Sequence, residues 1–594
     1  MIMSNNSDPG LMAMLIRLFR HVSHRRRRQF ALLLCLTVIS SFAEVVSLGA
    51  VLPFIGILTQ PEKVFGSPLM AGVVRTLGIT SGAGLVLPLT VAFAVAALVA
   101  GGLRLALLWV SIRLGNDTGA DLGIEVYRRT LYQPYSVHVA RSSSEIISGI
   151  TQKVGGVTSV LISAVTVVTL APLFVAVMMT LLAIDPMVAI IAAVSFGSAY
   201  GLIAWQTRHR LVHNSQRIAQ EQTQVIKALQ EGLGAIRDVL LDGAQTVYCD
   251  VYRRAILQLQ RAGGENRFMN QAPRYAMEAL GMALIAVFAL ALSNRPGGVA
   301  AALPILGVLA LGAQRLLPLM QQLYGNWSVL AGSKAALTDV LGLLDQPLPA
   351  AASQPEPAPL ILRESISLDN IRFRYGNSGP WVLDEIDLVI PKGARIGFVG
   401  STGSGKSTAL DLLMGLLEPT QGRILVDGQA IGHELKRAWQ RAIAHVPQNI
   451  FLADGTIAEN IAFGIPPDQI DHQRVQKAAD QARIGEFIES RPEGYGALVG
   501  ERGVRLSGGQ RQRIGIARAL YKQASVLIFD EATSALDSST ELAVMDAIEN
   551  LDRDLTVLII AHRLTTLRNC DTIVKLENRK IVSRSTYKEL LSIS

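Results

Sequence analysis

Long apolar runs dominate the first half of the chain, and short alternating runs replace them in the second half. Each long run has close to 20 or more residues, which is the length that an α-helix needs to cross a bilayer. The pattern predicts about six membrane-spanning helices. These are Phe30–Leu58, Leu85–Val110, Val157–Ile184, Met187–Trp205, Ala276–Leu292 and Val299–Leu317.

Two long polar connections join the second span to the third and the fourth to the fifth. They run from Asn116 to Lys153 and from Gln206 to Asn270, and they are poor in proline. We therefore expect the spans to continue into water as helices, interrupted at Tyr132–Tyr135 and again at Gly232–Asp238. Such breaks favour short transverse helices that contact a soluble domain, although ordinary helix breaks are the alternative.

Arginines set the expected orientation. His24–Arg28 precedes the first span, and further arginines occupy both long connections. Under the positive-inside rule the N-terminus and these connections lie in the cytosol. The first apolar run is too long for a signal peptide, and a nucleic-acid role for the arginine run is the weaker interpretation.

The second half reads as a soluble α/β domain. Composition changes at Asp345–Pro349, and an Ala- and Pro-rich linker follows. We expect a cytosolic segment over 1–29, a membrane domain over 30–330, a linker over 331–360 and a soluble α/β domain over 361–594. Apolar runs predict strands at Ile366–Tyr375, Trp381–Ile390, Arg395–Val399, Ala442–Val446, Val526–Asp530 and Thr556–Ile560.

Composition agrees with a membrane protein. Half of the 594 residues are hydrophobic and the net charge is +8, while the mean hydropathy is +0.35. A basic chain can bind nucleic acid, but the apolar runs explain the balance better, and we expect no nucleic-acid partner. Cys35, Cys249 and Cys570 are far apart and show neither metal-ligand nor disulfide spacing.

One glycine-rich stretch carries the strongest chemical signal. It has the pattern G-x-x-x-x-G-K-[ST] between an apolar strand and a predicted helix, which makes a chance turn improbable. Such a loop must wrap its backbone N–H groups closely around phosphate oxygens, so we expect side chains to be excluded at Gly403 and Gly405. Lys406 is expected to reach the β- and γ-phosphates, and the Ser407 hydroxyl to ligate Mg²⁺. The loop comprises Gly400, Ser401, Thr402, Gly403, Ser404, Gly405, Lys406, Ser407 and Thr408.

Two acids end the apolar run Val526–Asp530. Asp530 is placed to hold Mg²⁺ through its water shell. Glu531 is then placed to polarise an attacking water. Two carboxylates at the end of a buried strand are unusual as mere surface acids.

A Ser-Gly-Gly turn opens a second predicted helix and gives another anion-binding end, formed by Ser507, Gly508, Gly509 and Gln510. In the order found here, the glycine loop, this turn and the acidic strand resemble the ATP-binding cassette transporters. The resemblance is to exporters in which a membrane half precedes one nucleotide-binding domain, and it covers the chain from the first predicted span onward.

The resemblance implies further site residues. Tyr375 corresponds to the aromatic that stacks on adenine, and Gln448 to the glutamine that contacts Mg²⁺ and the membrane domain. His562 corresponds to the histidine that holds the γ-phosphate. Ser534–Asp537 match the D-loop of the family, and Gly500–Gly503 resemble the exporter X-loop, which meets the cytosolic helices. The implied catalytic set is Glu531, His562 and Gln448, and the implied metal ligands are Ser407, Gln448 and Asp530.

The resemblance also implies the assembly. Two copies form a head-to-tail homodimer that holds two ATP molecules with Mg²⁺, each between the glycine loop of one domain and the Ser-Gly-Gly turn of the other. Closure drives the membrane halves from inward-open to outward-open, and hydrolysis resets them. A chain with one such domain is a half-transporter.

Three arginines in or beside the spans bear on the cargo: Arg104, Arg274 and Arg315. Charges in spans are costly and suggest function. All three fall near the depth of the inner-leaflet headgroups, where they can engage an anionic headgroup such as a pyrophosphate. Snorkelling to the interface, or pairing with Glu278, is an equal alternative.

Short stretches resemble the flippases that move lipid-linked oligosaccharides: Ser41–Glu44, Leu52–Ile55, Pro134–Tyr135 with Ser143–Glu145, and Arg315–Pro318. We therefore expect an ATP-driven flippase for a polyprenyl-pyrophosphate-linked glycan in a bacterial inner membrane, with lipids and an anionic lipid-linked substrate as partners. An exporter of lipid A-type lipids, drugs or peptides is the alternative among transporters. An ATP-gated channel or regulator is the alternative from another class.

Overall fold

The computed structural model describes residues 10–50, 54, 57–58, 62, 65–66, 81–184, 186–293, 316–376, 378–531, 541, 554–561 and 563–593. The chain divides into two compact units. The first comprises residues 1–133 and 138–348, and the second comprises 349–594 together with Pro134–Val137. The boundary at Leu348 lies inside the predicted linker, because residues 334–344 form a helix that packs within the first unit.

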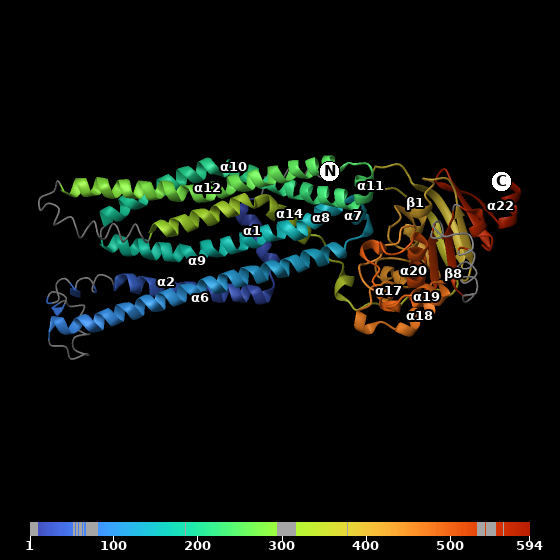
Figure 1. Cartoon of the computed structure of the whole chain (residues 1–594), viewed down its shortest axis with the longest axis horizontal. Helices are drawn as coiled ribbons and strands as arrows, with labels where there is room; N and C mark the ends of the chain where they lie inside the picture. The colour runs from blue at the N-terminus through green and yellow to red at the C-terminus, as the bar shows by residue number, and fades with distance from the viewer. Residues whose placement is uncertain are drawn as a thin grey trace. The chain divides into compact units, whose positions relative to one another are not determined.

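Long helices that run beside one another build the first unit (Figure 1). Its described helices are α1 (Leu11–His21), α2 (His24–Gly49), α6 (Gly82–Leu131), α8 (Ser143–Ser148), the π-helix η1 (Gly149–Lys153), α9 (Val154–Ile184), α10 (Pro186–Gly234), α11 (Ile236–Leu241), α12 (Gln245–Ser293) and α14 (Lys334–Leu344). The short helix α7 (Tyr135–Ala140) begins in the residues that group with the second unit.

Four helical stretches in the described part of the chain are long and apolar enough to cross a membrane. They are His24–Ser47, Gly82–Leu131, Ser143–Met179 and Ala189–Gly234, and they contain most of the first four predicted spans. The fifth predicted span, Ala276–Leu292, lies in α12. The sixth lies outside the described residues except for 316–317, which are helical.

The spans continue as long helices, as the polar connections predict. Helix α6 extends to Leu131 and α10 extends to Gly234. Both predicted interruptions are present, because α7 begins only after Pro134 and α11 begins at Ile236. Proline disfavours helical geometry in the residue before it, which explains the first break. Pro186 opens α10, where its missing N–H costs nothing.

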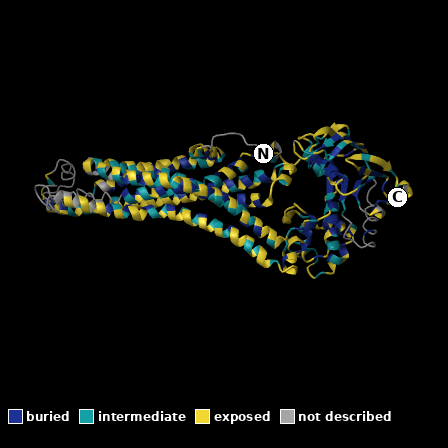
Figure 2. Cartoon of the chain, turned by 90° about the horizontal axis from the view of Figure 1, so that it is seen from above, coloured by how far each residue is buried: buried dark blue, intermediate teal, exposed yellow. Residues whose placement is uncertain are grey.

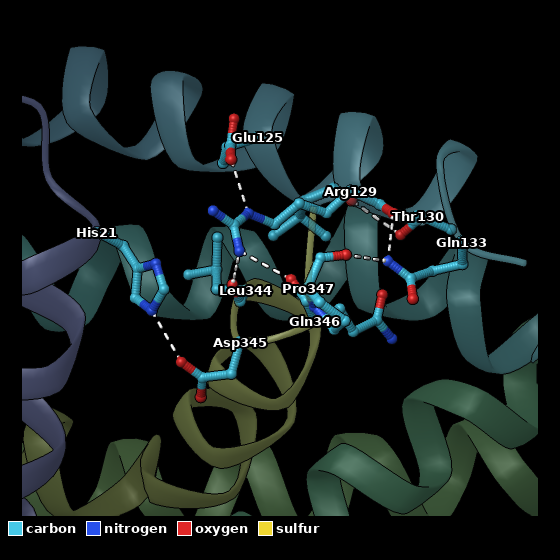
Figure 3. Close-up of polar contacts among 10 residues, drawn as sticks. His21, Glu125, Arg129, Thr130, Gln133, Leu344, Asp345, Gln346 and Pro347 are labelled. Carbon is cyan, nitrogen blue, oxygen red and sulfur yellow. Dashed lines mark hydrogen bonds and ion pairs between the residues drawn. The ribbon is translucent and has the colours of Figure 1, made fainter. Parts of the chain in front are cut away.

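Polar contacts within the first unit hold the segment that follows α14 (Figure 3). Arg129 of α6 donates from Nη1 to the carbonyl oxygens of Leu344 at 2.5 Å and Gln346 at 2.8 Å. His21 Nε2 of α1 lies 2.9 Å from Asp345 Oδ1. A guanidinium that satisfies two carbonyls at a helix C-terminus is a strong local anchor, since charge-assisted hydrogen bonds are stronger than neutral ones.

Two sheets form the second unit. Strands β1 (Ser365–Phe373), β2 (Leu383–Pro391), β4 (Gln421–Val426) and β5 (Gln429–Ala430) make an antiparallel sheet in the order β2-β1-β4-β5. The second sheet has the order β10-β9-β3-β8-β7-β6 and is parallel except for β10. Its strands are β3 (Arg395–Val399), β6 (Ile443–Val446), β7 (Val526–Asp530), β8 (Thr556–Ile560), β9 (Thr572–Glu577) and β10 (Lys580–Ser585).

Buried side chains cover both faces of the parallel sheet. On β7, Val526 and Ile528 join one apolar cluster, while Leu527 and Phe529 join another. Successive strand residues point to opposite faces, so a continuous apolar run marks a strand that is covered on both sides. Figure 2 shows this concentration of buried residues in the second unit, whereas exposed residues extend along the long helices of the first.

The parallel sheet brings the predicted site residues to one edge. The glycine loop follows β3 and Gln448 follows β6, while Asp530 ends β7 and Glu531 follows it. Strand β8 lies between β3 and β7. Because carboxyl ends of neighbouring parallel strands meet at the same edge, these segments converge there, which is where α/β sheets bind ligands.

Candidate functional site

Glycine is required in the loop for two different reasons. At Gly400 (φ 154°) a Cβ atom would lie 2.1 Å from the carbonyl oxygen of Leu576, and at Gly405 (φ 99°) it would lie 2.7 Å from Leu383 Cδ2. Around a Cβ at Gly403 (φ 82°), no atom of the described residues lies within 4 Å. The left-handed backbone favours glycine at both Gly403 and Gly405, and at Gly405 a side chain would also clash with Leu383. The exclusion of side chains by bound phosphate stays a prediction at both positions.

Lys406 is folded into the loop as the first residue of α15 (Lys406–Leu413). Its Nζ donates to the carbonyl oxygens of Gly400 at 2.8 Å and Ser401 at 3.0 Å. The buried hydroxyl of Ser404 has no hydrogen-bond partner among the described residues. This buried hydroxyl, a lysine and a helix N-terminus lie beside Gly400 and Gly405, where a side chain would clash, and together they fit the phosphates of a nucleotide. Ser407, in the same first turn, is exposed and available to a metal ion.

The acids at the end of β7 form a connected group. Gln448 Nε2 donates to Glu531 Oε2 at 2.7 Å. Burial raises the pKa of Asp530, and the Glu531 charge raises this pKa further, while Lys406 opposes both. An acid pair beside a lysine and a glycine loop fits Mg²⁺ and its nucleotide, because a divalent cation relieves the repulsion between the carboxylates.

Glu531 has an unusual backbone. Its φ is 51°, in the left-handed region that residues other than glycine seldom adopt. Its N–H donates to the carbonyl oxygen of Ile560 at 3.0 Å, so the neighbouring strand β8 holds this conformation. Strain of this kind is usual at functional positions, where the fold directs a side chain toward its task.

The Ser-Gly-Gly turn opens α20 (Gly508–Tyr521) through a capping box. The Ser507 hydroxyl accepts from the Gln510 N–H at 3.2 Å, and Gln510 Oε1 accepts from the Ser507 N–H at 2.8 Å. Gly508 and Gly509 are the first residues of the helix. Gln510 therefore acts here as a helix cap, and the first-turn N–H groups provide the positive potential for an anion.

Tyr375 lies beside the glycine loop. Its ring is about half exposed and packs edge-on against Phe373, with centroids 4.9 Å apart. Its hydroxyl oxygen lies 3.4 Å from Thr408 Oγ1. A half-exposed aromatic ring next to a phosphate loop is suited to stack on a base.

Asp411 lies in α15, about one turn after Ser407, and is a charged residue that the sequence patterns did not single out. Burial raises its pKa to about 6, and the charge of Asp530 contributes. The sequence feature that could have identified Asp411 is its place as a lone acid inside the apolar run Ala409–Leu417.

The remaining predicted residues separate into two groups. His562, Arg315 and Ser534–Asp537 lie outside the described residues. In the first unit, Arg104 Nη1 lies 3.5 Å from Glu44 Oε1, and Arg274 Nε donates to Glu278 Oε1 at 2.8 Å. The alternative of pairing with Glu278 is therefore observed for Arg274, whereas Arg104 pairs with Glu44 on another helix.

Comparison with known proteins gives one family model, described as ABC transporter, over residues 383–534. A protein named ATP-dependent lipid A-core flippase from Chromohalobacter salexigens is 34% identical over 79% of this chain and 81% of its own. One with the same name from Cupriavidus pinatubonensis is 31% identical over 84% of both chains. A solved structure of a bacterial Atm1-family ABC exporter with ATP bound has a TM-score of 0.74 at 26% identity, with 96% of each chain covered.

Proposed function

The chain belongs to the ABC transporters, as a half-transporter of the exporter type, and on that premise we propose that it moves an anionic glycolipid of the lipid A-core type from the inner to the outer leaflet. ATP hydrolysis drives this transport. We place the chain in a bacterial inner membrane as a homodimer, with the N-terminus and the nucleotide-binding domain in the cytosol.

The site residues divide the work of hydrolysis among them. Lys406 and the N–H groups of the glycine loop bind the phosphates, while Ser407, Gln448 and Asp530 would hold Mg²⁺. The ion would supply positive charge that offsets the negative charge developing on the phosphates. Glu531 accepts the proton of the attacking water, and its contact with Gln448 orients the carboxylate. His562 is assigned to the γ-phosphate from its position after β8.

The homodimer completes each site. Ser507–Gly509 opens a helix whose first N–H groups lie in the same unit as the glycine loop. In the proposed dimer they bind the nucleotide held by the partner's loop. One chain carries both halves of the site, so two identical copies supply two complete sites.

The substrate class rests on one observation: relatives named for lipid A-core match this chain at 31–34% identity over about four fifths of its length. A polyprenyl-pyrophosphate-linked glycan is the second candidate. Both lipids present phosphate and sugar next to apolar chains, which agrees with a cation such as Arg104 within a predicted span. Both lipids therefore require a membrane domain that accepts phosphate and sugar next to apolar chains.

Substrate-stimulated ATP hydrolysis tests this proposal. The purified chain in nanodiscs is titrated with lipid A, with a polyprenyl-pyrophosphate glycan, with a cationic drug and with a peptide, beside the Glu531→Gln variant as the inactive control. We expect saturable stimulation by lipid A at the lowest concentration. Stimulation by the polyprenyl lipid alone would favour the second candidate, and stimulation by drug or peptide alone would refute the glycolipid assignment.

A further inference from the structure

A pocket in the nucleotide-binding domain lies away from the glycine loop. Its volume is about 630 Å³, which is within the usual range of small-molecule sites. The walls come mainly from α18 (His472–Gln481), α20 and the residues at the starts of β6, β7 and β8. All of these elements belong to the second unit, so one copy of the domain forms the pocket by itself.

The pocket lies at the edge of the parallel sheet that is opposite to the nucleotide site. Ala444, Leu527 and Leu555 line it, and they lie at or just before the starts of β6, β7 and β8. Ser525, another wall residue, precedes Asp530 by the length of β7, which is roughly 16 Å at about 3.3 Å per residue. A ligand in this pocket is therefore distinct from the nucleotide that the glycine loop holds.

One face of α18 presents charged and polar groups to the pocket. The α18 residues that line it are Arg474, Lys477, Ala478 and Gln481. Their spacing of three and four residues places them on the same side of the helix. The Asp471 carboxylate caps the start of α18 by accepting from the Arg474 N–H at 3.1 Å, and the helix packs against α20. The cations therefore stand on a fixed element rather than on a loop.

Arg474 is held in place without using its donors. Its guanidinium carbon lies 4.5 Å from the centroid of the Tyr521 ring, which is a cation–π contact. The Arg474 side chain makes no hydrogen bond or ion pair with the described residues, and its Nε is buried without a partner among them. A guanidinium has five N–H donors, so Arg474 keeps the capacity to bind an anion with several oxygens.

The charge on the pocket walls is positive. Lys477 is exposed and pairs with none of the residues that the structure describes. Lys392 Nζ lies 3.0 Å from Asp554 Oδ2, so these two wall residues offset each other. Asp554 is the only acid among the described wall residues, against the three cations Arg474, Lys477 and Lys392, which leaves a net charge of +2. The walls therefore favour an anionic ligand.

Apolar side chains form much of the remaining wall. They include Ile361, Leu520, Leu527 and Leu555. Ile361 is 70% exposed, whereas Leu527 is buried, so the pocket offers apolar surface both in contact with water and in the interior. A ring or an aliphatic group can pack on this surface while the cations bind a phosphate.

We propose that this pocket binds a phosphorylated small molecule of nucleotide size, with its phosphate on Arg474 and Lys477 and its organic part against Ile361 and Leu520. The guanidinium binds two phosphate oxygens at once, and the ammonium acts as a point charge. The site is separate from the ATP site and goes beyond the proposed transport function. Soluble metabolites and lipid headgroups both present phosphate beside an organic group, and the position of the pocket in the soluble domain favours the soluble source.

Isothermal titration calorimetry tests the proposal with the full chain in nanodiscs, its ATP sites saturated with a non-hydrolysable ATP analogue and Mg²⁺. The probes are uridine diphosphate, inorganic pyrophosphate, uridine and dihexanoyl phosphatidic acid. Lys477→Glu reverses one charge of the pocket, and Lys477→Arg keeps it. Lys588→Glu, at an exposed lysine of α22 (Tyr587–Ile593), is the matched control. Thermal unfolding of the same samples is the second measurement.

We expect uridine diphosphate to bind saturably at one site per copy and to raise the unfolding midpoint, because a ligand that binds only the folded chain stabilises it. Pyrophosphate lacks the organic part and uridine lacks the phosphate, so both bind more weakly. Lys477→Glu weakens the binding of uridine diphosphate roughly 10- to 100-fold, which is the factor that one charge-assisted hydrogen bond supplies. Lys477→Arg and Lys588→Glu bind it as the unaltered chain does.

Three results would overturn the proposal. The first is the absence of saturable binding by both uridine diphosphate and pyrophosphate while the ATP sites are filled. The second is equal binding of uridine diphosphate by Lys477→Glu and the unaltered chain, which places the probe elsewhere. The third is tighter binding of dihexanoyl phosphatidic acid than of uridine diphosphate, which assigns the pocket to a lipid headgroup instead of a soluble molecule.

Discussion

Replacing Glu531 by glutamine removes the proposed base and little else. The two side chains have the same shape, and the amide oxygen can still accept the hydrogen bond that Gln448 Nε2 now donates at 2.7 Å. The left-handed backbone at this position is held by the N–H bond to Ile560, which the substitution leaves intact. The change therefore isolates proton acceptance from geometry.

The expected loss follows from general base catalysis, which contributes roughly 10²- to 10⁴-fold. This corresponds to about 3–5 kcal/mol in the barrier. Nucleotide affinity should not fall, because losing the Glu531 charge removes a cause of the raised pKa of Asp530 and leaves that metal ligand more readily ionised.

The assay measures phosphate release at saturating ATP in nanodiscs, together with equilibrium binding of a fluorescent ATP analogue. Glu434→Gln, at an exposed acid of the same domain, is the control and should match the unaltered chain in both. Hydrolysis above a tenth of the unaltered rate in Glu531→Gln would refute the assignment of the base. A parallel loss of nucleotide binding would show that Glu531 acts in binding instead.

Three further predictions concern stability, read from thermal unfolding of the full chain. Gly400→Ala should destabilise the nucleotide-binding domain by on the order of 3 kcal/mol, because the added Cβ would meet the Leu576 carbonyl oxygen. Gly403→Ala should destabilise it less, and equal destabilisation by the two variants would contradict the loop geometry. Asp411→Asn should stabilise the chain at pH 7.5 and much less at pH 5. The Asp411 pKa of about 6 in the folded state lies above its ordinary value of 3.8, so the folded chain loses stability as the pH rises through this range. The loss is about 1 kcal/mol after allowing for partial exposure. A gain in Asp411→Asn that does not depend on pH would contradict burial of the charged carboxylate as its cause. Arg129→Met should cost about 2 kcal/mol by leaving two carbonyl oxygens without their donor, whereas an unchanged midpoint would show that the segment after α14 needs no such anchor.

The sequence predicts the strands that read as continuous apolar runs well, and it misses several strands with more polar residues, at the edges and in the interior of the sheets alike. The bounds of β3, β7 and β8 agree with the apolar runs, because strands buried on both faces read as continuous apolar stretches. Strands β4, β5, β9 and β10 were not predicted. In β10 the residues Lys580–Ser585 are mostly exposed and polar, so no pattern distinguishes the strand from a loop.

The site shows the same division between local and long-range information. The glycine loop, the acid pair and the capping turn each occupy a few consecutive residues, so their spacing in the sequence already determines how these residues lie relative to one another. The Arg274–Glu278 pair was open to prediction because i and i+4 face each other on a helix. The Arg104–Glu44 pair joins two helices and the strain at Glu531 depends on β8, so both require the packed fold.

Direct observation of lipid movement tests the central claim, that one chain as a homodimer uses ATP to move an anionic glycolipid between leaflets. Fluorescent lipid A is placed in proteoliposomes with outward-facing nucleotide-binding domains, and its protection from an external quencher is followed after ATP is added. The account predicts ATP-dependent protection with the unaltered chain and none with Glu531→Gln. ATP hydrolysis without any protection of lipid A or of a polyprenyl-pyrophosphate glycan would contradict it.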